Sequence, residues 1–268
     1  MKHTFLDLYR DGDSRLHRLD ARVKFVATLG TIVALSLLPA GYWPGYLAVA
    51  AMVLAGVAGA GIPFAVALRR SAIALPFALM AAVSLPFTRP GAALWVLGVG
   101  PWRLVATREG LLALAALLGR AWLSLLAVGL LTATTPFPDL LAGLQALGLP
   151  RVLVAIISFL YRYLFVLVDE AERLWRARES RSARAGRRAG GSLSWRAQVL
   201  GRMIGSLFIR SYERSERVYQ AMVARGFRGQ VRSLTLQRVP AADLALGAAL
   251  FLALAAIVAG SHLAPGGG

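Results

Sequence analysis

The sequence predicts an all-α integral membrane protein, with about five transmembrane helices and a cytoplasmic layer of one short helix and two long amphipathic helices. Three observations support this fold class. Apolar residues make up 57% of the chain and its mean hydropathy is +0.62, both above the values of ordinary soluble domains. Several uninterrupted apolar runs are long enough to cross a bilayer. The formal charge is still +17, and over half of it lies in one basic segment of the C-terminal half.

The predicted spans are bounded by short turns or by basic residues, and four of them precede the basic segment. The first follows a polar N-terminal stretch that lacks the apolar core of a secretory signal, so we expect the N-terminus in the cytoplasm. Pro76 falls within the third span, where neighbouring helices would tolerate a kink. The five predicted spans are Val23–Leu38, Tyr46–Phe64, Ser71–Phe87, Gly110–Leu131 and Ala241–Gly260.

Residues 88–109, between the third and fourth spans, are rich in glycine and proline and indicate an external loop. A hairpin, or a re-entrant piece that enters the bilayer, is compatible with the same composition. The loop carries Arg89, Arg103 and Arg108. These charges run against the rule that lysine and arginine collect on the cytoplasmic side of a membrane protein.

The basic segment at residues 169–232 contains fifteen arginines and six acidic residues, and the positive-inside bias places it in the cytoplasm. The apolar block before it, residues 151–168, resembles another span, but a crossing there would export the basic segment. Arg162 would also lie in mid-membrane, where a charge is costly. We therefore expect a long amphipathic helix at the inner membrane face, from Pro150 to about Arg181. A plain crossing by residues 151–168 remains the alternative.

A second long helix is predicted from about Ser194 to Arg225. Its apolar row at the helical period consists of Trp195, Val199, Met203 and Leu207. The helix ends in Ala224-Arg225-Gly226, and a glycine directly after the last periodic residue is a helix stop. Arg225 is therefore presented on the final turn, where it can hold a partner.

These elements divide the chain into four parts. A short helix at Asp139–Leu147 follows the fourth span, and a flexible basic connection at Arg184–Ser192 links the two long helices. The predicted parts are a cytoplasmic N-terminal segment (1–22), a four-helix transmembrane part (23–131), a cytoplasmic domain (132–232) and a final transmembrane helix (241–260).

Little in the sequence indicates catalysis. The chain has no cysteine, its three histidines are scattered, and it contains no phosphate-binding GxxxxGK[ST] loop. The carboxylates at residues 169–172 and 213–216 have arginines three or four positions away, which favours ion pairs on helix surfaces over acid–base chemistry. Arg120 is the one ionisable residue near the middle of a predicted span. We therefore expect no catalytic residue, no metal ligand and no cofactor in this chain.

The high positive charge also suggests nucleic-acid binding, because clustered arginines neutralise phosphates. A membrane-anchored nucleic-acid binder would place stacking aromatic residues beside the basic run. Trp175 and Trp195 flank that run, but both fit the apolar faces of the long helices better. This class stays as an alternative that co-purifying nucleic acid would favour, and we expect no nucleic-acid partner.

Three segments resemble the transmembrane T components of energy-coupling factor (ECF) transporters. SRLHRLDARVKFVATL is similar to the LHxLDPRxKL motif of that family, with Ala21 in place of its proline. The family's GLP segment and first coupling helix are similar to GLPRVLVAIISFLYRYLFVLVDEAERLWRARESRS in this chain. Its second Ala-Arg-Gly signature is similar to AMVARGFRG. The first signature is usually also Ala-Arg-Gly, whereas the corresponding place here is Ser180-Arg181-Ser182, with Arg178 and Arg184 as alternative registers.

The resemblance implies a non-catalytic scaffold that couples two cytoplasmic ABC-type ATPase subunits, which bind ATP and magnesium, to a substrate-binding membrane subunit. Arg181 and Arg225, at the tips of the two long helices, would engage the ATPase subunits together with Ala224 and Gly226. Closing of the ATPase pair would draw the tips together and move the crossed helices. The substrate-binding subunit would contact the apolar helix faces, represented by Phe159, Tyr161, Phe165, Met203, Leu207 and Phe208.

The opening YRDGDSRLHRLD is most similar to the cobalt or nickel branch of the family, in which the T component works with one fixed substrate subunit. The resemblance therefore implies a cobalt or nickel importer in the inner membrane, of the kind associated with cobalamin biosynthesis. A vitamin transporter of the same family is the main alternative.

Overall fold

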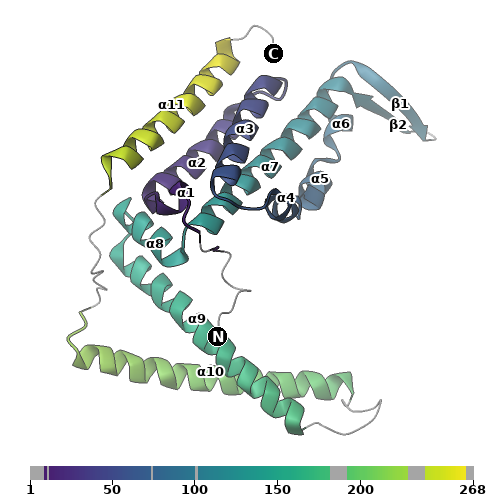
Figure 1. Cartoon of the computed structure of the whole chain (residues 1–268). Helices are drawn as coiled ribbons and strands as arrows, with labels where there is room; N and C mark the ends of the chain where they lie inside the picture. Colours follow the sequence, from purple (N-terminus) through teal and green to yellow (C-terminus); the bar gives the residue numbers. More distant parts are fainter. Residues whose placement is uncertain are drawn as a thin grey trace. The chain divides into compact units, whose positions relative to one another are not determined.

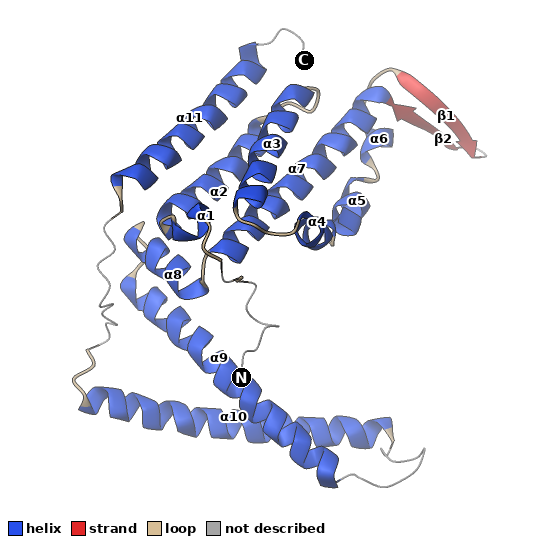
Figure 2. Ribbon diagram, in the orientation of Figure 1, coloured by secondary structure: helices blue, strands red, loops and turns tan. Residues whose placement is uncertain are grey.

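The computed structural model describes residues 9–10, 12–73, 75–99, 102–181, 192–228 and 239–263. These residues are almost all helical, with one two-stranded sheet among them (Figure 2), which confirms the predicted all-α class. They form two compact units. One unit is built on the long helices α9 (Arg151–Arg181) and α10 (Leu193–Ala224), and the other contains the remaining described elements (Figure 1).

The larger unit is a bundle in which α7 has the most extensive contacts. Its longest members, α2, α3, α7 and α11, are the helices that contribute its buried apolar core. The elements of this unit are α1 (Arg15–Arg18), α2 (Ala21–Leu37), α3 (Trp43–Gly59), α4 (Phe64–Ala72), α5 (Leu75–Ala82), α6 (Leu85–Thr88), β1 (Ala93–Val99), β2 (Trp102–Thr107), α7 (Arg108–Thr134), α8 (Phe137–Ala146) and α11 (Ala241–Leu263).

Glycines allow the bundle helices to approach closely. A Cβ atom on Gly56 of α3 would lie 2.8 Å from a methyl carbon of Leu130 on α7. A Cβ on Gly247 of α11 would lie at the same distance from a methyl of Val23 on α2. Small residues at such crossings bring helix backbones together, which gains packing energy where no hydrophobic effect operates between helices in lipid.

Four stretches of the described chain are long and apolar enough to cross a membrane. Three of them, at Phe64–Thr88, Arg108–Thr134 and Ala241–Leu263, correspond to predicted spans. The fourth is Arg151–Ser180 in α9, so the alternative of a crossing by this helix stays open, and its place at the inner membrane face stays a prediction. The other two predicted spans are α2 and α3, with 17 residues each.

The third predicted span, Ser71–Phe87, is wrong as a single helix. The chain instead forms α4, α5 and α6. α3 ends at Gly59 rather than at Phe64, and α4 begins at Phe64. Pro76 and Pro86 are each the second residue of a short helix, α5 and α6. A proline has no N–H and its ring clashes with the carbonyl four residues earlier, so it fits the first turn of a helix and interrupts a longer one.

Of the two alternatives for residues 88–109, a hairpin or a re-entrant piece, the described residues form a hairpin. Strands β1 and β2 pair antiparallel, with Val96 opposite Val105 and Val99 opposite Trp102. The hairpin projects beyond the start of α7 (Figure 1). That this segment lies outside the cell stays a prediction.

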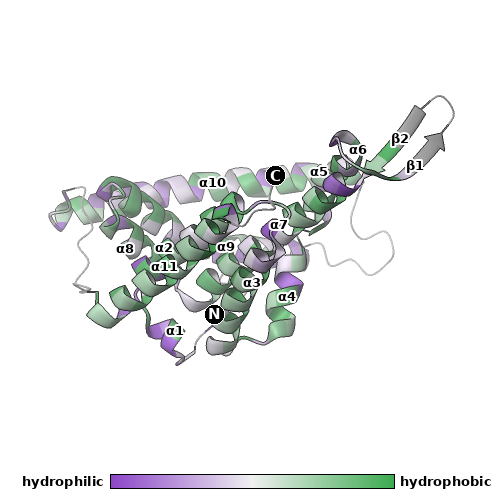
Figure 3. Cartoon of the chain, turned by 90° about the horizontal axis from the view of Figure 1, so that it is seen from above, coloured by the Kyte–Doolittle hydropathy of each residue, from purple (hydrophilic) through white to green (hydrophobic). Residues whose placement is uncertain are grey.

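The short and long helices of the predicted cytoplasmic domain form nearly where expected. α8 spans Phe137–Ala146, close to the predicted Asp139–Leu147. Pro150 precedes α9, and the hydroxyl of Ser192 caps α10 by accepting a hydrogen bond from the Trp195 amide at 3.3 Å. Figure 3 shows hydrophobic and hydrophilic residues alternating along α10, whereas α11 is mainly hydrophobic. The predicted connection at Arg184–Ser192 lies outside the described residues, except for Ser192.

Candidate functional site

The last turn of α10 forms a complete Schellman cap around the predicted Ala-Arg-Gly. Arg225 is the C-cap residue, and Gly226 follows with φ +82°. The Gly226 amide donates to the Val223 carbonyl at 2.9 Å, and the Phe227 amide donates to the Met222 carbonyl at 3.0 Å. These two bonds define the motif, which needs a left-handed residue that glycine adopts without strain. The sequence Ala224-Arg225-Gly226 is therefore a helix terminus whose geometry fixes where Arg225 leaves the backbone.

Arg225 is exposed, as are its neighbours Ala224 and Gly226. Among the residues that the structure describes, none forms an ion pair or side-chain hydrogen bond with its guanidinium group. A guanidinium presents five donors in a rigid planar fork and stays charged when it is desolvated. The end of α10 thus carries an exposed cation available to a carboxylate or to helix C-terminal carbonyls of another protein.

Phe227 anchors this cap to α9. Its ring is partly buried and meets the ring of Phe159 edge to face, with 6.4 Å between centroids and 84° between planes. Aromatic pairs of this geometry contribute about 0.5–1.5 kcal/mol beyond the area that they bury. The predicted contact residue Phe159 therefore also holds the tip of α10 against the first helix.

The three possible registers of the first arginine differ in the structure. Arg178 lies within α9, and its guanidinium stacks over the Trp175 ring at 5.0 Å. The Trp175 indole in turn donates to a Glu179 carboxylate oxygen at 2.8 Å. Arg181 is the last residue of α9, and Arg184 lies outside the described residues. Arg178 is already engaged on its own helix, and the choice of Arg181 over Arg184 stays a prediction.

Glu170 joins the two long helices. Its carboxylate accepts from Arg210 of α10 at 2.8 Å and from Arg173 of α9 at 2.8 Å. The Glu170 side chain is mostly buried, whereas both arginines are largely exposed. Charge-assisted hydrogen bonds are stronger than neutral ones, although solvent screens pairs as exposed as these. The Glu170–Arg210 ion pair therefore holds α9 and α10 together at the point where they cross, and its contribution to the free energy of unfolding is small.

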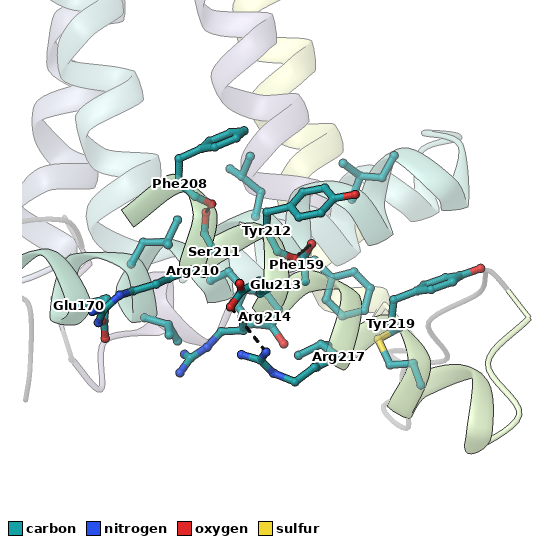
Figure 4. Close-up of a pocket in the computed structure, with 18 of the residues that line it drawn as sticks. Phe159, Glu170, Phe208, Arg210, Ser211, Tyr212, Glu213, Arg214, Arg217 and Tyr219 are labelled. Carbon is teal, nitrogen blue, oxygen red and sulfur yellow. Dashed lines mark hydrogen bonds and ion pairs between the residues drawn. The ribbon is translucent and has the colours of Figure 1, made fainter. Parts of the chain in front are cut away.

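A groove of about 750 Å³ lies between α9 and α10. Its lining is mainly apolar, and several of its aromatic side chains face solvent: Phe208 is 70% exposed and Tyr212 is 61% exposed. Figure 4 shows the rings of Phe208 and Tyr212 on one side of α10 and the guanidinium groups of Arg214 and Arg217 on another. Large exposed apolar patches with a polar rim usually mark a binding surface for a protein or a membrane.

The groove unites only part of the predicted contact set. Phe159, Leu207 and Phe208 line it, whereas Met203, Tyr161 and Phe165 do not. The rings of Tyr161 and Phe165 instead meet each other edge to face, with centroids 5.1 Å apart.

Tyr212 and Tyr219 also line the groove but were not among the predicted contacts. They continue the apolar row of α10 at helical spacing, so the row itself is the signal that could have identified them.

The N-terminal motif forms a buried polar junction in the larger unit. Ser14 caps α1, and Asp20 caps α2 by accepting from the Arg22 amide at 2.8 Å. Lys24 is 8% exposed, and its ammonium group donates to the carbonyls of His17 and Thr134 at 3.1 and 3.0 Å. Thr134 is the last residue of α7. Lys24 therefore binds the C-terminal ends of α1 and α7, where the helix dipole favours a cation.

Asp243, at the start of α11, completes this junction. Its carboxylate accepts from the backbone N–H of Asp20 at 2.9 Å. The contact fixes the final helix to the beginning of the first long one. Sequence reasoning assigned no role to Lys24 or Asp243, because Thr134 and Asp20, their respective partners, are far away along the chain.

Arg120, the charge that the sequence places in mid-span, has a structural role. Its Nε donates to the Tyr46 hydroxyl at 2.7 Å, and its Nη2 donates to the Leu38 carbonyl. Leu38 is the C-cap of α2, and the Tyr46 hydroxyl donates to the same carbonyl at 3.3 Å. The arginine thereby neutralises the free carbonyl end of α2 next to the turn into α3. Across the described residues, no three histidine or acidic side chains gather as metal ligands would.

Comparison with known proteins shows which family this chain is similar to. The family model CbiQ, described as a cobalt transport protein, matches residues 12–235. The cobalt transport protein CbiQ of Rhodobacter capsulatus is 32% identical over 184 residues, which cover 69% of this chain and 72% of that protein. The energy-coupling factor transporter transmembrane protein EcfT of Acidaminococcus fermentans is 30% identical over 233 residues, or 84% of this chain and 83% of that protein.

A second protein named EcfT, from Listeria innocua, is 30% identical over 238 residues, which cover 85% of this chain and 86% of that protein. The matched region reaches from the N-terminal junction past Arg225. The chain therefore belongs to the CbiQ family of transmembrane components of energy-coupling factor transporters.

Proposed function

We propose that this chain is the coupling subunit of a metal importer: it joins two ABC-type ATPase subunits to a substrate-binding membrane subunit and transmits the movement of the first to the second. In this proposal α8, α9, α10 and the N-terminus lie on the cytoplasmic side of the inner membrane. The ATPase subunits bind ATP and magnesium, and this chain contributes no catalytic residue.

The observation that carries the proposal is the free guanidinium of Arg225 on a rigid helix cap. The cap holds the Cα of Arg225 in one direction, and among the described residues no carboxylate neutralises it. Such a group matches a groove that ends in carboxylates or in helix carbonyls, because a planar fork of donors can satisfy two acceptors at once. Ala224 on the same turn allows a close approach, since it adds only a methyl group.

Arg181 at the end of α9 supplies the second contact in the proposal. The two long helices are already joined at Glu170 and through Phe159 and Phe227, so they respond as a pair when their tips move. Closing of two ATPase subunits on ATP would bring the tips together and change the crossing of the helices. The free energy of nucleotide binding would reach the membrane in this way.

The substrate-binding subunit would occupy the apolar faces of α9 and α10. The groove between them carries exposed aromatic rings on one side of α10 and arginines on another. This arrangement suits two partners: the substrate-binding subunit on the aromatic side and the ATPase subunits on the arginine side. We propose Phe159, Leu207 and Phe208 in the groove as contacts, and Met203, Tyr161 and Phe165 as contacts outside it.

Cobalt is the substrate that we propose first. The family model and the Rhodobacter capsulatus relative are both described as cobalt transport proteins, whereas the names of the EcfT relatives specify no substrate. Nickel and a vitamin are the alternatives within the family. A metal-uptake assay on the assembled complex, with cobalt and nickel in competition, separates these possibilities.

The experiment that tests the proposal is co-purification with the ATPase subunits of the same organism. The wild-type chain should retain both ATPase subunits, and Arg225→Ala should lose them or lose transport. The expected loss of binding free energy is about 2–5 kcal/mol, the range for a desolvated charge pair that loses one partner.

Arg202→Ala is the matched control, because Arg202 is also exposed on α10 but lies about 34 Å from residue 225 along the helix axis. The control should behave as wild type. An Arg225→Ala chain that assembles and transports normally would refute the proposal.

A further inference from the structure

The hairpin β1–β2 is held at the end of a membrane-crossing helix. The Thr107 hydroxyl donates to the Arg89 carbonyl at 2.8 Å. The amide of Arg108 donates to the Ala92 carbonyl at 3.0 Å, and the amide of Ala92 donates to a Glu109 carboxylate oxygen at 2.8 Å. α7 begins at Arg108 and is one of the stretches able to cross the membrane. Because these bonds fasten the hairpin to the first turn of α7, its base lies at a membrane surface.

This surface is the one at the far end of α7 from α8. α7 runs from the hairpin to Thr134, and α8 follows directly. The hairpin and α8 are therefore on opposite sides of the membrane, whichever way the chain is oriented.

The hairpin is too apolar for water and unsuited to the hydrocarbon core. Leu94 is 59% exposed and Trp95 is 74% exposed. In the described part of the chain the sheet has two strands, so the outer edge of each strand has backbone groups without a ladder partner. An isolated hairpin is marginal in water, and unpaired backbone groups are excluded from the bilayer core. The headgroup layer covers apolar side chains and also offers hydrogen-bond partners to the free backbone groups. Tryptophan is enriched in this layer.

The base of the hairpin also presents two cations. Arg89 and Arg108 are exposed, and neither has an ion-pair partner among the described residues. Their backbones are neighbours, since the Thr107 hydroxyl, one residue before Arg108, bonds to the Arg89 carbonyl. A phosphate group is the acceptor that guanidinium groups at a membrane surface would meet.

The apolar surface of the neighbouring helices continues into the hairpin. Exposed side chains line α5, the turn after it, α6 and the first turn of α7, in a chain where lipid is the surrounding solvent. These side chains are Phe77, Met80, Val83, Phe87 and Leu111. The occupant of the hairpin surface is therefore the same bilayer that covers these helices.

We propose that the hairpin is a membrane-interface anchor: Leu94 and Trp95 insert among the lipid headgroups, and Arg89 and Arg108 bind phospholipid phosphates at the base. This site accounts for the arginines of residues 88–109, which the positive-inside rule leaves unexplained. It positions the N-terminal end of α7 against the bilayer while the other end of the helix leads to α8. The assignment depends on α7 crossing the membrane and is independent of any ATPase partner.

The first test measures the depth of the hairpin. The chain contains no cysteine, so Trp95→Cys and, separately, Leu94→Cys give single labelling sites for a bimane fluorophore on the full chain in vesicles. Lipids with a nitroxide at the headgroup or shallow in the acyl chain should quench either label strongly, and a deep nitroxide should quench it less. Bimane at Asp13→Cys, an exposed site before α1, is the unquenched control. Labels at 94 and 95 that behave like the label at 13 would overturn the proposal.

The second test identifies the ligand of the arginines. The detergent-solubilised chain is titrated with phosphatidylglycerol, and the bimane emission at residue 95 reports binding. Each of Arg89→Gln and Arg108→Gln should raise the half-saturation concentration about fivefold, the equivalent of the usual contribution of one basic residue near an anionic surface. Arg202→Gln on α10 should have no effect. Unchanged titrations in both hairpin variants, or an equal response to inorganic phosphate alone, would overturn the assignment to lipid.

Discussion

Gly226 is the residue through which the α10 cap can be tested without removing the arginine. Its φ of +82° lies in the left-handed region, and a Cβ at this position would meet nothing within 4 Å. Gly226→Ala therefore creates no clash and changes only the conformational preference of the backbone. A non-glycine residue in the left-handed region costs about 1–2 kcal/mol. We expect the capped conformation to be disfavoured by roughly five- to thirtyfold, with the guanidinium of Arg225 still present.

The predicted consequence is a weaker attachment of the ATPase subunits. Their apparent affinity for the Gly226→Ala chain should fall by about the same factor, because part of the binding energy would restore the cap. The affinity can be measured by titrating the purified ATPase into the chain in nanodiscs. Gly201→Ala is the matched control: Gly201 lies inside α10, and its added Cβ also meets nothing within 4 Å. In the helix interior alanine is favoured over glycine by about 0.5–1 kcal/mol, so this variant should bind as wild type and melt no lower.

A Gly226→Ala chain that binds the ATPase as tightly as wild type would refute the reasoning, provided that Arg225→Ala fails to bind. It would mean that the charge of Arg225 matters and its direction does not. The Phe227–Phe159 contact would then be sufficient to hold the tip.

Three further changes test the contacts that position the helices. Lys24→Met leaves one buried carbonyl, of Thr134, and one partly buried carbonyl, of His17, without their donor and should lower the free energy of unfolding by about 1–3 kcal/mol, visible as a lower Tm in detergent, whereas the exposed Arg202→Met should leave the Tm unchanged. Tyr46→Phe removes one of the two acceptors of Arg120 and should cost about 1 kcal/mol in the same assay; an unchanged Tm would show that the α2 end needs only the Arg120–Leu38 contact. Glu170→Gln should have a small effect on stability, about 0.5 kcal/mol or less, yet broaden the distance distribution between spin labels on α9 and α10; a distribution as narrow as wild type would contradict the role of Glu170 at the crossing.

The long helices were predictable from sequence because their ends carry local signals. Pro150 before α9 and Gly226 after α10 act on their own turns of the chain, and the structure places both helix ends within a residue or two of the prediction. The interruptions at Pro76 and Pro86 were missed for a related reason. Hydropathy registers an apolar stretch whether or not a proline divides it, and a proline in a membrane helix can mark either a kink or a new first turn.

The polar junctions could not be predicted because their partners are distant in sequence. Lys24 meets Thr134, and Arg120 meets Leu38, through backbone carbonyls that any residue type provides. No pattern of side chains therefore marks the acceptor. The groove has the same limit: Phe159 and Phe165 both lie on α9, but the crossing with α10 decides that only Phe159 lines the groove. Helical periodicity identifies the apolar face of α9, but the place where α10 crosses it decides which residues of that face line the groove.

The most direct measurement of the central claim is a crosslink from the tip of α10 to an ATPase subunit. In the cysteine-free chain, Arg228→Cys introduces a reactive site on an exposed residue three positions beyond Arg225 and leaves that arginine intact. Gly201→Cys, near the other end of α10, is the control site. With a short bifunctional maleimide and an ATPase subunit that carries an engineered cysteine in its surface groove, residue 228 should form a crosslink and residue 201 should not. No crosslink from residue 228, or equal crosslinks from both sites, would contradict the account.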